Sequence, residues 1–246
     1  MRRNFWLCIV LFFSVTWPAC AQSSSPAPDA GKKTAGTVDA EVVAARAATR
    51  EKRYADSEAL MLKATASQPE AILPWVELGL AQIGLRKYAE AEKSFKIALG
   101  IDQSPTPEIQ GVAYSSLGEI YARTGRITEA EAAFDTAVKV FPSDAALYLR
   151  NETILFVQVG NTDAQLRAVE KAITVDPGRA ILYYFKGQAL VPKATVDPQT
   201  HKMILPPGCA EAYQKYLELE PRGQFAYDAR GLLTTAGLPL KVKSKK

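Results

Sequence analysis

The feature that most constrains the fold of this chain is a pattern of large and small residues that occurs twice. The fuller copy reads Tyr114-x2-Leu117-Gly118-x2-Tyr121, followed by Ala130-x3-Phe134-x2-Ala137-x4-Pro142. The earlier copy reads Trp75-x2-Leu78-Gly79, followed by Ala91-x3-Phe95-x2-Ala98. Residues three or four apart lie on one face of a helix, so each copy predicts a pair of amphipathic helices. A single pair cannot bury its apolar face, and it must therefore stack on further copies.

The small residues of the pattern mark expected contacts between helices. Gly118 stands where a side chain would hold two helices apart, and Ala130 is small for the same reason. We expect Phe134 to fill the gap between successive units and Ala137 to let the next helix approach. Pro142 follows the second helix and ends it, because proline cannot continue a helix.

This pattern resembles the tetratricopeptide repeat (TPR), a helix pair of about 34 residues. The resemblance covers residues 38–236 and implies an all-α, right-handed superhelix of about five helix pairs whose stack forms a binding surface. A C-terminal capping helix at 224–236 is expected to cover the last apolar face. The five expected units span about 38–71, 72–105, 111–144, 145–179 and 180–221.

The last two units depart from the pattern. In the fourth unit, Asn151 and Glu152 stand where leucine and glycine are expected. In the fifth unit the step from Pro177 to Pro221 is longer than a repeat, which places an insertion at 191–207. Its Asp-Pro step favours a type I turn between β-prone residues, so we predict a small β-hairpin there. This broken unit resembles those of exported bacterial TPR proteins, whose functions are mostly unassigned.

The N-terminus has the features of a secretory signal peptide. A basic start, a short apolar run and an Ala-x-Ala sequence ending at Ala21 predict cleavage after residue 21 and export to the bacterial periplasm or beyond. The alternative is a lipid anchor at Cys20, as in bacterial lipoproteins. Residues 22–37 are rich in Ser, Pro, Ala and Gly and are expected to form a disordered linker. The mature chain then contains no transmembrane segment.

The charge of the chain argues against nucleic acid as a partner. Removing residues 1–21 deletes two arginines and no acid, which lowers the net charge from +4 to +2. Four of the remaining lysines lie in the C-terminal segment 237–246, a basic tail that we expect to be solvated. Loose contact of this tail with an anionic surface is the alternative. A near-neutral body lacks the basic face that nucleic-acid binding requires.

Cys209 is the one cysteine that remains after cleavage of the signal peptide, and it therefore forms no internal disulfide. It falls at the small-residue position occupied by Ala91 and Ala130 in earlier units. This predicts a buried packing thiol, with a reactive or intermolecular thiol as the alternative.

No residues support catalysis, a metal site or a cofactor. His201 is the only histidine and belongs to the expected hairpin, where a solvated turn residue is the simplest interpretation. The sequence contains no Cys/His cluster with metal-ligand spacing, no phosphate-binding glycine loop and no Gly-x-Ser-x-Gly motif. We therefore expect no catalytic residues, no metal and no cofactor.

The resemblance implies that the first helices line a concave groove and that their non-motif residues meet a peptide or protein partner. The helix expected at 145–159 is apolar nearly all round, and the alternative is that the C-terminal helix or the hairpin covers its second face. The slots of the family's carboxylate clamp hold Val42, Arg46, Glu77, Val112 and Ser116, so that clamp is absent. The expected groove residues are Val76, Leu80, Ile83, Arg46, Arg50, Arg123, Leu149, Thr153, Phe156, Ile181, Tyr184 and Gln188.

The sequence thus predicts a non-enzymatic protein-binding scaffold of the cell envelope with an unidentified partner. One alternative is a lipid-anchored assembly factor of an envelope complex. A second alternative, from a different class, is an enzyme accessory subunit or a cryptic hydrolase.

Overall fold

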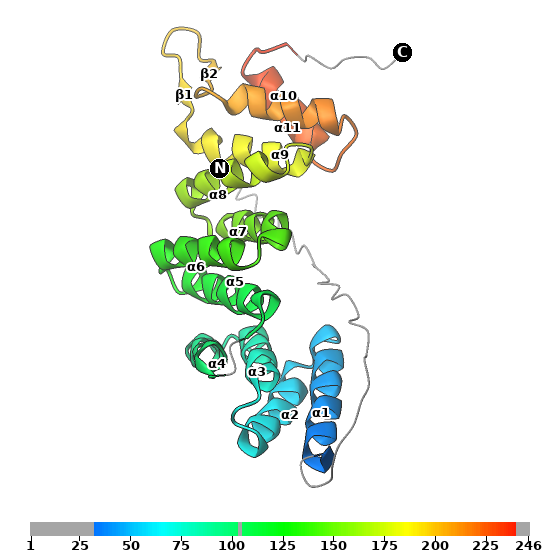
Figure 1. Cartoon of the computed structure of the whole chain (residues 1–246). Coiled ribbons are helices and arrows are strands. Elements are labelled where there is room, and N and C mark those ends of the chain that lie inside the picture. Colours follow the sequence, from blue (N-terminus) through cyan, green and yellow to red (C-terminus); the bar gives the residue numbers. More distant parts are fainter. Residues whose placement is uncertain (1–31, 103–104, 240–246) are drawn as a thin grey trace.

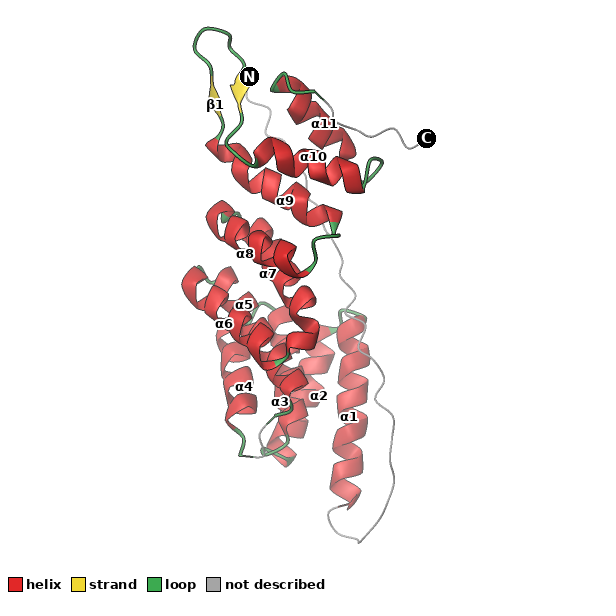
Figure 2. Ribbon diagram, turned by 45° about the horizontal axis from the view of Figure 1, so that its top comes forward, coloured by secondary structure: helices red, strands yellow, loops and turns green. Residues whose placement is uncertain are grey.

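The computed structural model describes residues 32–102 and 105–239, in which consecutive helices pair and stack along one axis (Figures 1 and 2). The expected signal peptide, Cys20 and most of the basic tail lie outside these residues. The helix pairs are α1 (Lys32–Arg50) with α2 (Tyr54–Ser67), α3 (Ile72–Gly84) with α4 (Tyr88–Gly100), α5 (Pro107–Arg123) with α6 (Ile127–Val140), α7 (Ala145–Val159) with α8 (Thr162–Val175), and α9 (Ala180–Leu190) with α10 (Cys209–Leu219). A last helix, α11 (Ala226–Thr235), follows at the C-terminal end of the stack. The expected all-α superhelix is confirmed.

Two helix boundaries differ from the expected ones. Helix α1 begins at Lys32, so residues 32–37 are helical and do not belong to an extended linker. Helix α5 begins at Pro107, whose missing N–H and fixed φ suit the first turn of a helix. The Thr106 hydroxyl caps this turn by accepting a hydrogen bond from the backbone N–H of Ile109.

Each glycine of the repeat motif receives an aromatic ring from the second helix of its own unit. A Cβ atom added to Gly118 would lie 2.7 Å from the Phe134 ring, and one added to Gly79 would lie 2.7 Å from Phe95. A glycine in the first helix lets the second helix approach closely enough for the ring to pack on bare backbone. Phe134 also belongs to one core cluster with Tyr148, Leu155 and Phe156 of the next unit, which agrees with the expectation that it fills the gap between units.

The first helices form one continuous layer of the stack. Helix α1 contacts α3, α3 contacts α5, α5 contacts α7, and α7 contacts α9. Among the second helices in the described part of the chain, only α6 and α8 approach one another comparably. In a curved stack the inner layer is the more closely spaced one, so the first helices lie on the inner side. This agrees with the groove that the TPR resemblance implies.

Ion pairs link the outer layer of neighbouring units. The acid that follows the small residue of each early second helix pairs with a cation of the next unit. The distances are 2.7 Å for Glu58–Lys87, 2.8 Å for Glu92–Arg126 and 2.8 Å for Glu131–Arg167. Such partly exposed pairs each contribute little stability, but they recur at the same position of three successive units.

In the fourth unit, the residues at the leucine and glycine positions lie one residue later in the chain than the sequence analysis assigned them. The turn that joins α5 to α6 is closed by a hydrogen bond from Arg126 N–H to the Tyr121 carbonyl, and the matching bond in the next unit runs from Asn161 N–H to the Phe156 carbonyl. This match places Glu152 and Thr153, and not Asn151 and Glu152, at the leucine and glycine positions. The assignment from sequence was wrong by one residue.

The predicted hairpin is present and small. Strands β1 (Thr195–Val196) and β2 (Met203–Ile204) pair antiparallel, with Thr195 opposite Ile204. The Asp197 carboxylate holds the turn by accepting hydrogen bonds from the backbone N–H groups of Gln199 and Thr200, each at 2.8 Å. A short 3-10 helix, η2 (Val191–Lys193), leads from α9 into this insertion.

Cys209 is fully buried, as predicted. Its thiol donates a weak hydrogen bond to the Gly187 carbonyl at 3.5 Å. Burial, together with the nearby charge of Glu211, raises the pKa of the thiol to about 11, so the thiolate is suppressed at neutral pH. The packing interpretation is confirmed for the folded chain.

Candidate protein-binding surface

The candidate surface is the inner face of the first helices, which their neighbours leave uncovered. The glycine position packs on the second helix of the same unit, and other motif residues pack on adjacent units. The residues two before each aromatic position and one after each glycine position remain partly exposed. The polar members of this set are Glu119 and Gln188, and we call its apolar members the inner stripe: Leu73, Leu80, Val112, Leu147, Ile154 and Ile181.

The inner stripe is anchored in the core without being part of it. Leu80 and Val112 pack against the cluster built around Phe95, and Ile154 and Ile181 pack against the cluster built around Phe185. Each side chain therefore has a fixed position and still presents apolar area to solvent. A row of this kind can take up apolar side chains from an extended or helical peptide.

Eight of the expected groove residues are partly or fully exposed. They are Arg46, Arg50, Leu80, Ile83, Arg123, Ile181, Tyr184 and Gln188. Leu80 and Ile181 belong to the inner stripe. Arg123 lies on α5 with Val112, whereas Arg46 and Arg50 lie on α1.

The other four expected groove residues are buried, and their assignment to the groove was wrong. Thr153 and Phe156 have no exposed surface, and Leu149 is also buried. All three come from the fourth unit, where the alignment slipped by one residue. A slip of one residue turns a side chain by about 100° around the helix axis, which exchanges the core face for the inner face. Val76 is buried in the cluster around Phe95.

Sequence reasoning missed Leu147 and Ile154, the inner-stripe residues of α7. The signal that would have found them is the 35-residue step from Pro142 to Pro177. That step gives Ile154 the same position in the fourth unit that Glu119 has in the third and Leu80 has in the second. Aligning the units on their terminal prolines predicts the inner face correctly.

An ion pair joins the first two units at the N-terminal end of the surface. The Arg46 Nε donates to Glu77 Oε1 at 2.6 Å across α1 and α3. Burial raises the pKa of the Glu77 carboxyl, and the charges of Arg46 and Arg50 oppose that rise. Because Arg46 is already paired with this buried acid, it offers less free charge to a ligand than its sequence position suggests.

A second polar link crosses the middle of the surface. The Arg123 Nε donates to Glu119 Oε1 at 2.7 Å, and another guanidinium nitrogen donates to the Gln158 side-chain oxygen at 3.1 Å. This connects α5 to α7 across the inner stripe. The surface therefore combines apolar rows with an arginine whose orientation is fixed.

At the C-terminal end the surface is closed by aromatic packing. Tyr184 stacks on Phe225 with ring centroids 4.2 Å apart and an interplanar angle of 17°. Burial raises the pKa of Tyr184 to about 12, with the charge of Asp228 adding to the effect. Phe225, the residue that precedes α11, thus covers part of this position.

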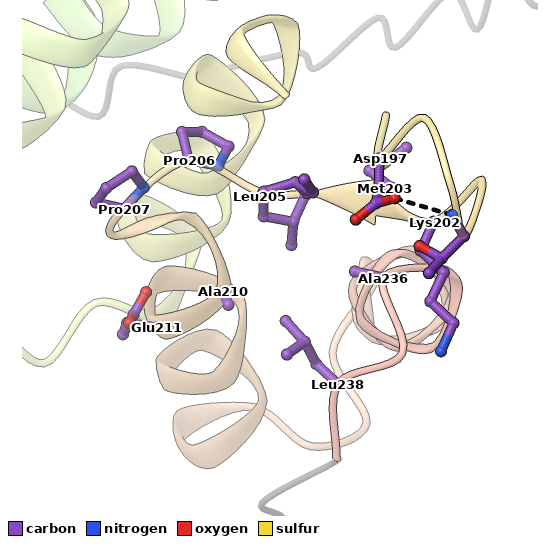
Figure 3. Close-up of a pocket in the computed structure, with 12 residues that line it drawn as sticks. Asp197, Lys202, Met203, Leu205, Pro206, Pro207, Ala210, Glu211, Ala236 and Leu238 are labelled. Carbon is purple, nitrogen blue, oxygen red and sulfur yellow. Dashed lines mark hydrogen bonds between the residues drawn. The ribbon is translucent and has the colours of Figure 1, made fainter. Parts of the chain in front are cut away.

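A separate hollow of about 510 Å³ lies between the hairpin, α10 and the end of α11 (Figure 3). Met203, Leu205, Ala210 and Leu238 form its apolar lining, and Lys202 and Glu211 lie at its rim. Asp197 and Thr200 of the hairpin also line it.

The described residues show no arrangement suited to metal-based chemistry. No group of three or more His, Cys, Asp or Glu side chains among them is placed to hold a metal ion. His201 is exposed at the hairpin turn with a positive φ of 56°. None of the described helices is long and apolar enough to cross a membrane.

Sequence comparison places the repeats in a known family. Residues 74–105 and 110–150 each match the tetratricopeptide repeat family. These matches, together with the stacked helix pairs, identify the chain as a tetratricopeptide repeat protein. No curated protein matches the sequence.

Solved structures share the fold at low sequence identity. YrrB, described as a TPR protein with an unusual peptide-binding site, aligns with a TM-score of 0.54 and 17% identity over 82% of this chain and 100% of its own. A crystal structure of MamA gives 0.57 and 18% over 76% and 94%. The pilF protein of Pseudomonas aeruginosa gives 0.56 and 12% over 83% and 89%. At these identities the likeness establishes the fold alone.

TPR proteins bind protein or peptide partners and are generally non-catalytic scaffolds. That class assignment agrees with the inner stripe.

Proposed function

We propose that this protein is an exported scaffold of the bacterial cell envelope that binds a segment of a partner protein along the inner stripe. The observation that carries the proposal is the row of anchored, partly exposed apolar side chains on successive first helices. Contiguous apolar surface with a polar rim is typical of protein-binding sites. Export is supported by the signal-like N-terminus of the sequence.

The partner segment is expected to be amphipathic. Apolar side chains of the segment would contact Leu80, Val112 and Ile154, because these residues lie on consecutive first helices. An acidic or amide group of the segment would meet Arg123, whose guanidinium is held in place by Glu119 and Gln158. Burial of this apolar area supplies most of the affinity, and the arginine supplies orientation.

A capture experiment with paired variants tests this proposal. The double variant Leu80→Arg with Ile154→Arg puts two charges on the inner stripe at partly exposed positions. The matched control is Leu62→Arg on α2, where the leucine is 52% exposed on the outer layer. Envelope extract is passed over each immobilised protein, and captured proteins are identified by mass spectrometry.

We expect wild type and the Leu62→Arg control to capture the same partner and the double variant to lose it. Equal capture by all three would reject the inner stripe as the binding site. Export is tested separately, by cell fractionation and by determining the N-terminus of the protein isolated from the envelope. An unprocessed N-terminus in the cytoplasmic fraction would reject the export proposal.

A further inference from the structure

One repeat position at the edge of the inner face is cationic in the first three units. It is the residue five places after the glycine position, which Ala45 occupies in the first unit, one repeat before Gly79. We call this set the rim row: Arg50, Gly84, Arg123, Gln158 and Pro192. The rim row therefore carries positive charge over the N-terminal units and none over the last two.

Contacts between neighbouring units show that members of the rim row lie side by side. The Arg123 guanidinium donates a hydrogen bond to the Gln158 side-chain oxygen at 3.1 Å. Helix α1 contacts α3, and a Cβ atom added to Gly84 would lie 2.3 Å from the ring of Tyr54, which follows the α1–α2 turn. That turn, which Arg50 begins, thus packs against the end of α3. Arg86 comes two residues after Gly84 and adds a second cation at this edge.

Arg50 and Arg86 are not neutralised by acids of the chain. Both are exposed, and within the described residues neither forms an ion pair. The charge of Arg50 acts on the buried Glu77 carboxyl, which already pairs with Arg46. The cations that follow in the same turns pair with acids of the outer layer, as in Arg53–Asp56, Lys87–Glu58 and Arg126–Glu92. Uncompensated positive charge therefore remains at Arg50 and Arg86.

The backbone of these turns favours glycine, yet the first two units keep a long cationic side chain there. The turn residue with positive φ is Gly125 in the third unit and Gly160 in the fourth, at 81° and 73°. The same position holds Lys52 at 61° in the first unit and Arg86 at 60° in the second. A side chain in this region costs conformational energy that glycine avoids. Positive charge is thus kept at these turns against a local structural preference.

We propose that the partner segment bound along the inner stripe carries a run of Asp or Glu residues, which lies over the first three units against Arg50, Arg86 and Arg123. This inference rests on the proposed function, because it assigns the chemistry of a segment that occupies the inner stripe. Carboxylates complement the uncompensated cations, and arginine binds a carboxylate through two parallel N–H groups.

The charge of this edge is separate from the carboxylate clamp of the family. Arg50, Arg86 and Arg123 stand outside the clamp slots, where Val42 and Ser116 are among the residues found. Cations spread over three units suit several side-chain carboxylates along a segment, and not a single terminal carboxylate.

Labelled synthetic peptides of equal length and equal leucine content are the probes. The acidic peptide carries Glu at the polar positions of one half and Gln at those of the other half. The neutral peptide carries Gln throughout, and a basic peptide carries Lys in place of Glu. Binding to the full chain is measured by fluorescence anisotropy at low ionic strength and again at about 0.15 M salt.

We expect the acidic peptide to bind about tenfold more tightly than the neutral one at low ionic strength, and the basic peptide to bind most weakly. The advantage of the acidic peptide should shrink at the higher salt concentration, because exposed charges are screened.

The matching change in the protein is Arg50→Gln with Arg86→Gln, which removes two exposed charges and leaves no acid without its partner. This variant should lose the preference for the acidic peptide and bind the neutral peptide like wild type. The control is Lys93→Gln with Lys139→Gln, which also removes two exposed cations that form no ion pair within the described residues. Those lysines lie on the second helices α4 and α6, so the control should bind both peptides like wild type.

The inference is wrong if wild type binds the acidic peptide no more tightly than the neutral one, or if the arginine variant keeps the preference. The variant Leu80→Arg with Ile154→Arg separates this failure from that of the proposed function, and it is measured with the neutral peptide alone. Unchanged binding there rejects the inner stripe, whereas lost binding there with a preference for acid that survives in the arginine variant rejects only the acidic partner. Binding to phosphatidylglycerol vesicles that the arginine variant loses, with no preference for the acidic peptide, would overturn the inference in favour of an anionic membrane surface.

Discussion

Replacing Glu152 with leucine should stabilise the protein at neutral and alkaline pH. Glu152 has no exposed surface, although its position corresponds to the buried leucines Leu78 and Leu117 of earlier units. Its Oε1 accepts a hydrogen bond from the Lys171 ammonium at 3.2 Å, and its Oε2 has no hydrogen-bond partner among the described residues. A half-satisfied buried carboxylate is costly, so the fourth unit contains an intrinsic weakness.

The size of the expected gain in the free energy of unfolding follows from the pKa of this carboxyl. Burial raises the pKa of Glu152 from its usual value near 4.5 to about 7, and the charge of Lys171 only partly opposes the rise. Between these two values the folded state keeps a proton that the unfolded chain has released. The free energy of unfolding therefore falls as pH rises through this window and levels off above it. At about 1.4 kcal/mol per pH unit, the loss across the window is about 3 kcal/mol.

Urea unfolding followed by circular dichroism at 222 nm tests this prediction at pH 5 and pH 8. We expect Glu152→Leu to exceed wild type by about 3 kcal/mol at pH 8 and by much less at pH 5. Glu152→Gln should also remove the pH dependence, because it cannot ionise. Neither change leaves Lys171 without an ion-pair partner, because its ammonium still donates a hydrogen bond to Asp135 at 2.6 Å. A Glu152→Leu protein that is equally or less stable than wild type at pH 8 would refute the reasoning.

Three further predictions address packing and the insertion. Gly118→Leu should lower stability by about 1–3 kcal/mol or more, because the new side chain collides with the Phe134 ring, whereas Gly100→Ala should be nearly neutral; melting curves of both variants check this. Cys209 should react slowly with a thiol reagent in the native protein and rapidly in denaturant, and fast native labelling would contradict its buried position. Replacing residues 194–204 with a short Gly-Ser link should leave the helical circular dichroism and melting near normal while weakening partner capture, and a large drop in melting temperature would show that the hairpin supports the fold.

The repeat architecture of this chain was predictable from sequence because its contacts are local. Gly118 and Phe134 meet within one helix pair, and the proline after each second helix marks where that pair ends. A motif that specifies one unit also specifies the next, since each unit contacts only its neighbours. The burial of Cys209 was predictable on the same grounds, as it occupies a position already defined by Ala91 and Ala130.

The binding surface was less predictable because it depends on rotation about the helix axis. Leu149, Thr153 and Phe156 seemed to face the groove until the turn hydrogen bond between Asn161 and Phe156 fixed the register of α7. One residue of slip turns the side chains by about 100°, and an irregular repeat such as the fourth contains too few motif residues to exclude it. The packing of the neighbouring helices decides this register.

The sequence by itself determined the class of fold, the number of helix pairs and the residues that must be small. Only the tertiary structure decided which glycine lacks its ring. Gly231 follows the motif as well as Gly187 does, but Gly187 is filled by Tyr213 from a second helix that returns after the hairpin. Whether a packing position is filled depends on where another segment lies in space, and residue spacing along one helix does not contain that information.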